Sequence, residues 1–210
     1  TITGAPISSL TLSLTAGWNL ISGISTLGNI DDPAEIIASG AIYGYDNSYS
    51  EANTIEPGKG YWVNALADGD ITISSGGAAK TRSVDRTVKA NKLSFNGNDL
   101  YFGVSIPEEE MLSYQLPPKP PIGAFDVRFA DNMKVSETEG TIEVMNNIDR
   151  LTISYTINIK AEEHMKWVLA SDEGKEYELN GSGEIVVNGD VTGFTLKKAP
   201  EIPLTYSISQ

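Results

Sequence analysis

The sequence LTISYTINI, residues 151–159, alternates apolar and polar side chains without a break and is the clearest structural signal in the chain. A strict two-residue period predicts a β-strand with one buried face. Shorter apolar stretches and Asn-Gly turn signals follow it, at 167–169, 180–181, 185–187, 188–189 and 194–196. Short strands separated by turns predict an antiparallel β-sandwich of the Ig/Fn3-like kind for residues 93–210.

Three further segments of this second domain carry local signals. Leu93 and Phe95 lead into Asn96-Gly97, which is typical of a type I′ hairpin turn. The stretch LPPKPP, residues 116–121, cannot be a central strand because proline donates no ladder hydrogen bond. It is expected to cross a sheet edge in an extended conformation. Glu108-Glu109-Glu110 follows Pro107 and is expected to begin a short helix.

The first 75 residues predict a small β domain with one short helix. Alternating or apolar stretches at 10–14, 18–22, 42–45, 61–63 and 71–73 indicate strands. Pro57-Gly58 suits a type II turn. Residues 31–40 carry helix signals: Asp32 as a cap, Pro33 in the first turn, Glu35 three residues after the cap, and Gly40 at the end. The chain is therefore expected to be mainly β.

Charge divides the chain into three parts. Residues 1–75 have a net charge of -7, residues 76–92 of +4, and residues 93–210 of -10. The middle part is small, polar and basic, so it is expected to be a linker between the domains 1–75 and 93–210. A basic strip between two acidic bodies also favours their association.

Composition excludes several classes of protein. The chain has no Cys, which excludes disulfides and thiol chemistry, and its pI near 4.4 argues against a nucleic-acid partner. No apolar run approaches the roughly 20 residues that a membrane helix needs, so membrane insertion is not expected.

Catalytic and metal-binding signals are sparse. His164 is the one imidazole available to a Ser-His-acid triad, no Gly-x-Ser-x-Gly motif accompanies it, and it is expected on a surface loop. A glycosidase carboxylate pair stays open because the sequence does not give its spacing. No catalytic residue, metal ligand or cofactor is assigned. Calcium remains an alternative at Asp31-Asp32 and Asp68-Asp70, which are better explained as helix caps and a turn.

Aromatic residues offer the one candidate binding surface. Tyr43, Tyr45, Tyr49 and Trp62 are the candidate ligand-binding residues, because rows of flat aromatic faces suit sugar rings. An acidic domain would accept a neutral glycan better than a polyanion. The alternative is that Trp18, Tyr43 and Trp62 belong to the core of a small barrel. Trp167, which Val168 and Leu169 follow, is expected in the core.

Several stretches resemble known bacterial families. The motifs GWNLIS (17–22), IYGY (42–45) and PGKGYWV (57–63) resemble a small domain of bacterial secreted and surface proteins. The motifs LYFG (100–103), LPPKPPIGAFDVRF (116–129) and LTYSISQ (204–210) resemble the region before the sorting signal of type IX secretion cargo. The resemblance implies export, a non-catalytic role at the bacterial cell surface, and a sorting domain beyond Gln210 in the parent protein. Thr1 is then expected to be a mature or internal start.

Three functions follow as hypotheses. The first is a structural or adhesive module pair of an exported protein, whose partners are other domains of that protein or cell-surface material. The second is a carbohydrate-binding accessory of a secreted enzyme, with a polysaccharide as partner. The third is a self-associating subunit of an extracellular fibre, in which the extended stretch 1–13 adds a strand to a neighbour's sheet. An autonomous hydrolase is a fourth and weaker alternative.

Overall fold

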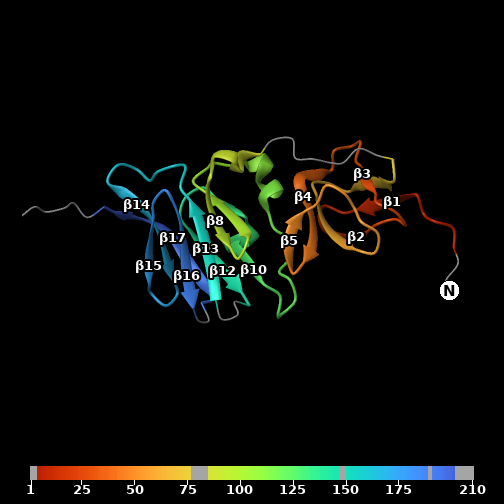
Figure 1. Cartoon of the computed structure of the whole chain (residues 1–210). Coiled ribbons are helices and arrows are strands. Elements are labelled where there is room, and N and C mark those ends of the chain that lie inside the picture. Colours follow the sequence, from red (N-terminus) through yellow and green to blue (C-terminus); the bar gives the residue numbers. More distant parts are fainter. Residues whose placement is uncertain (1–3, 77–84, 147–149, 189–190, 202–210) are drawn as a thin grey trace, which may run out of the picture.

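The structure is a computed structural model that describes residues 4–76, 85–146, 150–188 and 191–201. It is mainly β and elongated, with the two predicted domains side by side (Figure 1). The N-terminal and C-terminal ends of the described chain lie at opposite ends of the molecule (Figure 1). Among the described residues, no helix is long and apolar enough to cross a membrane.

The first domain packs two antiparallel sheets against each other. One sheet has the order β1-β7-β3, formed by Ser9–Leu14, Gly69–Ser74 and Asn29–Asp31. The other has the order β2-β6-β4-β5, formed by Gly17–Ser22, Gly60–Ala65, Ile37–Asp46 and Ser48–Glu51. Isoleucines from both sheets fill the space between them, so the domain has its own hydrophobic core.

The second domain is a larger sandwich, which confirms the predicted fold class. One sheet has the order β10-β12-β17-β14-β15, formed by Asp126–Phe129, Gly140–Met145, Gly193–Pro200, Met165–Ser171 and Glu176–Leu179. The other has the order β11-β9-β8-β13-β16, formed by Val135–Ser136, Asn98–Phe102, Asn91–Phe95, Arg150–Thr156 and Ser182–Asn188. All pairings are antiparallel except the short β11-β9 pair. The inward-facing side chains of both sheets form one core.

Most local predictions for the second domain are confirmed. Strand β13, Arg150–Thr156, contains residues 151–156 of the alternating stretch and lies between β8 and β16, whereas residues 157–159 lie beyond its end. Asn96 and Gly97 join β8 to β9 with φ values of 46° and 89°, as a type I′ turn requires. Trp167 is buried, and its indole N–H donates to the carbonyl of Ile159 at 3.1 Å.

The helix predicted for residues 31–40 is wrong. The segment forms a turn and then enters β4. The Asp32 carboxylate does accept hydrogen bonds from Ile36 N and Ile37 N, both at 2.9 Å, but Glu35 has a left-handed φ of 53° that stops a helix. Ile36 and Ile37 are β-branched and both buried, so core packing favours the strand. Gly40, expected to end the helix, sits with φ 72° where the β4-β6 register shifts at a bulge.

Part of the predicted linker lies outside the described residues, at 77–84. Its described end packs on the second domain. Residues Arg86–Lys89 form the short 3₁₀ helix η1, whose cap is the Asp85 carboxylate, and β8 begins at Asn91. Arg86 pairs with Glu110, and its backbone N–H donates to the Tyr114 hydroxyl at 2.8 Å.

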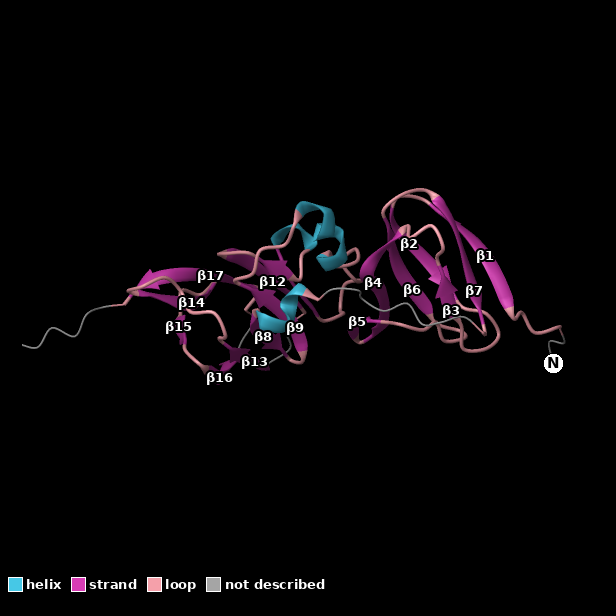
Figure 2. Ribbon diagram, turned by 90° about the horizontal axis from the view of Figure 1, so that it is seen from above, coloured by secondary structure: helices cyan, strands magenta, loops and turns pink. Residues whose placement is uncertain are grey.

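The predicted short helix after Pro107 is confirmed as the 3₁₀ helix η2, Glu108–Tyr114. It lies at the junction between the domains, beside β4 of the first domain (Figure 2). A third, short 3₁₀ segment, η3 (Ala130–Asn132), follows β10.

Candidate ligand-binding site

Strand register places the predicted aromatic residues on one face of the first domain. In the four-stranded sheet, Trp62 lies opposite Tyr43 on one side and opposite Leu20 on the other, and Tyr45 lies opposite Tyr49. Side chains alternate along each strand, so all of these point away from the core.

The rings of the three tyrosines lie edge to face. The ring centroids are 5.3 Å apart for Tyr45 and Tyr49, and 6.5 Å apart for Tyr43 and Tyr49. Trp18 extends the row, with its ring 6.0 Å from that of Tyr43. The structure therefore brings the aromatic candidates together as an outer face, which we call the aromatic face (Trp18, Tyr43, Tyr45, Tyr49 and Trp62).

The second domain covers part of this face. Tyr43 is buried beneath it, and the Lys134 ammonium group lies 5.6 Å from the Tyr43 ring centroid and 5.8 Å from that of Tyr114. Lys134 is itself buried and forms an ion pair with Glu51 across the junction. The Asn64 amide donates to the Gln115 side-chain oxygen at 3.1 Å. Tyr43 is therefore part of the contact between the domains.

The proline-rich crossing supplies the other side of the junction. The Tyr49 hydroxyl donates to the Pro118 carbonyl at 3.0 Å. The Arg128 guanidinium, which is 1% exposed, donates to the neighbouring Pro117 carbonyl at 2.8 Å. Burial raises the pKa of Tyr49, although a hydrogen bond from the Trp62 indole and the charge of Arg128 oppose that rise. Tyr49 is therefore also engaged in docking and stays neutral at physiological pH.

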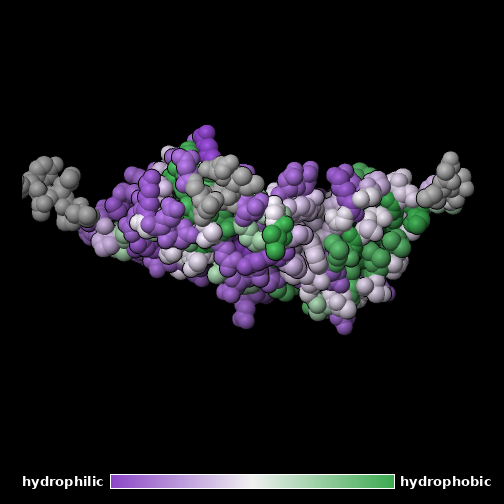
Figure 3. Space-filling view, turned by 90° about the horizontal axis from the view of Figure 1, so that it is seen from below, coloured by the Kyte–Doolittle hydropathy of each residue, from purple (hydrophilic) through white to green (hydrophobic). Residues whose placement is uncertain are grey.

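Tyr45 and its surroundings remain accessible. The Tyr45 side chain is 43% exposed, and Leu20 at the far edge of the face is 65% exposed. Seen from below, hydrophobic residues gather on the first-domain half of the surface, and the second-domain half is mostly hydrophilic (Figure 3).

A hollow of about 550 Å³ lies between Tyr45 and the second domain. The first domain contributes the tip of the β4-β5 hairpin, and the second domain contributes the β8-β9 hairpin and the loop before β10. The described residues that line it are Tyr45, Asn47, Ser48, Asn96, Asn98, Gly123, Ala124, Phe125 and Asn146. The sequence predicted Tyr45 but not the residues of the second domain, which are distant in the chain.

A second hollow, of about 330 Å³, adjoins the first and differs from it in charge. Acidic and basic side chains line it, including Glu51, Asp99, Asp126 and Lys134. Burial, together with the nearby carboxylate of Asp99, raises the pKa of Tyr101 to about 12.

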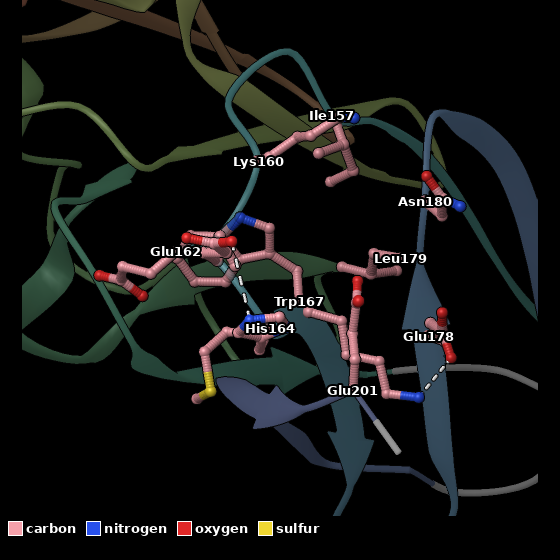
Figure 4. Close-up of a pocket in the computed structure, with 13 residues that line it drawn as sticks. Ile157, Lys160, Glu162, His164, Trp167, Glu178, Leu179, Asn180 and Glu201 are labelled. Carbon is pink, nitrogen blue, oxygen red and sulfur yellow. Dashed lines mark hydrogen bonds and ion pairs between the residues drawn. The ribbon is translucent and has the colours of Figure 1, made fainter. Parts of the chain in front are cut away.

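His164 lies on a surface loop, as expected. Its side chain is 85% exposed, its φ is 64°, and its imidazole lies 3.7 Å from the Glu163 carboxylate. It borders a hollow of about 270 Å³ at the far end of the second domain (Figure 4). Glu162, Glu178 and Glu201 border the same hollow, and its described lining contains no Ser, Thr or Cys that a His could activate.

The aspartates considered for calcium have structural roles. Asp68 accepts a hydrogen bond from Ala16 N at 2.8 Å, and Asp70 accepts one from the Ser13 hydroxyl at 2.6 Å. Asp32 holds the turn before β4, and Asp31 lies exposed in β3. In the described part of the chain, no three His, Cys, Asp or Glu residues are grouped so that they could hold a metal ion.

Comparison with protein-family models, with curated proteins and with solved structures gave no match to this chain.

Proposed function

We propose that this chain is a non-catalytic module pair of an exported bacterial protein, with a structural and adhesive role at the cell surface. The observation that carries the proposal is the docked junction, in which a buried lysine of one domain pairs with a glutamate of the other. A pair of domains docked in this way transmits force and holds a fixed spacing, as a surface spacer must.

The Lys134-Glu51 ion pair opposes separation of the domains. Lys134 is buried beside the rings of Tyr43 and Tyr114, so groups at the junction replace water around its ammonium group. Replacing Glu51 would leave the nearly buried Lys134 ammonium group without its carboxylate partner, which is unfavourable although Glu51 itself is partly exposed.

Separation would also expose apolar surface and break polar contacts. Tyr43 would lose its cover, and the hydrogen bonds Tyr49-Pro118 and Asn64-Gln115 would be lost. Contacts between groups distant in the chain hold the two sandwiches in one orientation.

The residues that carry the family resemblance support the proposed place at the cell surface. The motif at 116–129 contains Pro117, Pro118 and Arg128, which build the second domain's side of the junction. Part of the stretch that resembles exported cargo therefore takes part in the contact between the domains. The exposed position of His164 supports the non-catalytic part of the proposal.

The test uses intact cells of the source bacterium. The double variant Tyr49→Phe/Glu51→Gln removes the hydroxyl donor and the carboxylate of the junction but keeps the shape of both side chains. It should weaken docking by about 1–2 kcal/mol, which is roughly a 5- to 30-fold change in the ratio of docked to undocked protein. We expect antibodies to reach the wild-type protein on intact cells, and the variant to show equal surface amounts with severalfold weaker adhesion to the native substratum.

The matched control is Tyr177→Phe/Glu178→Gln, which makes the same changes at the distal strand β15 and removes the Lys166-Glu178 ion pair. It should adhere like the wild type. A protein that antibodies cannot reach on intact cells, or a junction variant that adheres like the wild type, would contradict the proposal.

A further inference from the structure

The hollow at the domain junction has an unusual lining for so acidic a chain. The protein has a net charge of -13, yet none of the described residues lining the 550 Å³ hollow is acidic or basic. The lining consists of four asparagines, one serine, two aromatic rings and small residues. The two hollows that share lining residues with it do contain charged side chains.

This lining selects for a neutral, hydroxyl-rich ligand. Asparagine amides both donate and accept hydrogen bonds, as sugar hydroxyls do, and aromatic rings cover the apolar faces of sugars. An ionic ligand would lose its hydration here without gaining an opposite charge.

The aromatic ring on the first-domain side is held in place before any ligand arrives. Tyr45 lies edge to face with Tyr49, and its hydroxyl donates to the Asn47 carbonyl at 3.2 Å. Because Tyr49 is bonded to the crossing segment, the orientation of Tyr45 is coupled to docking. A preoriented ring loses little conformational entropy on binding.

The polar groups on the second-domain side are also oriented. Asn96 accepts a hydrogen bond from Thr152 N at 2.9 Å, which leaves its amide N–H₂ as the donor available to a ligand. Asn98 donates to the Phe95 carbonyl at 3.4 Å, which leaves its side-chain oxygen as an acceptor. Phe125 packs against the core of the second domain and forms the apolar counterpart of Tyr45.

We propose that this hollow binds a segment of a neutral oligosaccharide, and that binding requires both domains. Tyr45 supplies the stacking face, Phe125 supplies an opposing apolar contact, and Asn96 and Asn98 hydrogen-bond to sugar hydroxyls. The inference rests on the adhesive part of the proposed function and gives it a ligand class.

A ligand that touches both domains also stabilises their docked arrangement. Binding to the docked state alone shifts the equilibrium toward it by mass action. Ligand binding would then favour the docked domains, and docking would in turn favour ligand binding.

The experiment is isothermal titration calorimetry of the full chain with xylohexaose, mannohexaose, cellohexaose and an anionic galacturonate hexamer. We expect at least one neutral hexasaccharide to bind, with an affinity that does not change between about 0.1 and 0.5 M salt, because no charge pair contributes. Tyr45→Ala and Phe125→Leu should each weaken binding at least about tenfold. The matched control Tyr177→Leu removes a partly buried ring that packs on the same core and should bind as the wild type does.

Three results would overturn the inference: no neutral hexasaccharide binds, the galacturonate binds more tightly, or Phe125→Leu binds as the wild type does while Tyr45→Ala does not. Each of them leaves the proposed structural function intact if the junction variant still loses adhesion. A thermal melt of every variant confirms that it is folded.

Discussion

Arg128→Ala should lower the free energy of unfolding of the second domain by about 3–5 kcal/mol, because it leaves the buried Asp126 carboxylate without its partner. The Arg128 guanidinium donates to Asp126 at 2.5 and 2.9 Å, and both side chains are almost fully buried. Its remaining donor group bonds to the Pro117 carbonyl and, at 2.9 Å, to the Asn132 side chain. The alanine variant loses the ion pair and also the contacts that fix the proline-rich crossing.

Denaturant unfolding measures this loss, followed by tryptophan fluorescence in a Trp18→Phe/Trp62→Phe background in which the buried Trp167 is the one remaining tryptophan. Arg150→Ala is the matched control, since Arg150 is exposed on β13, and it should change stability by less than about 0.5 kcal/mol. A loss of less than about 1 kcal/mol for Arg128→Ala would show that the buried ion pair does not support this region.

Asn91→Ala should cost a comparable amount, about 2–5 kcal/mol, because several backbone groups would lose their partner at once. Asn91 is 0% exposed. Its side-chain oxygen accepts from Asn158 N at 2.8 Å and Ile159 N at 2.7 Å, and its amide donates to the Ile159 carbonyl at 2.9 Å. These bonds hold the chain as it leaves β13, close to where Trp167 bonds to the same carbonyl.

The same denaturant titration tests this prediction, with Asn180→Ala on the surface as the control. Equal stabilities of Asn91→Ala and Asn180→Ala would contradict the structural role given to Asn91. Asn91→Asp adds a discriminating case, because it keeps the acceptor for both N–H groups but loses the donor to Ile159. It should therefore also destabilise the domain.

The sequence was sufficient for the β architecture because that architecture depends on local periodicity. The alternation at 151–159 predicts β13, and the Asn96-Gly97 pair predicts its hairpin, since both signals reside in neighbouring residues. The helix at 31–40 failed for the opposite reason. Local capping signals favoured it, but burial of Ile36 and Ile37 against a core built from distant strands decided the outcome.

The sequence indicated only the first-domain part of the candidate site. The aromatic residues of the first domain stand out by type, and strand register does place them on one face. Nothing local indicated that the second domain would cover Tyr43 and Tyr49, or that Asn98 and Phe125 would face Tyr45 across a hollow. Those relations depend on how the two sandwiches dock, which no short-range pattern encodes.

Single-molecule FRET on the intact chain distinguishes two docked domains from two domains that move independently. The chain lacks cysteine, so Thr26→Cys in the first domain and Glu173→Cys in the second, both exposed, provide unique labelling sites. We predict one narrow distribution of transfer efficiencies between about 0.1 and 0.5 M salt, because the buried Tyr43 and the neutral hydrogen bonds Tyr49-Pro118 and Asn64-Gln115 hold the junction without depending on charge. The same distribution should broaden in the Tyr49→Phe/Glu51→Gln background. A broad or multiple distribution in the otherwise wild-type chain would show that the two domains are not docked.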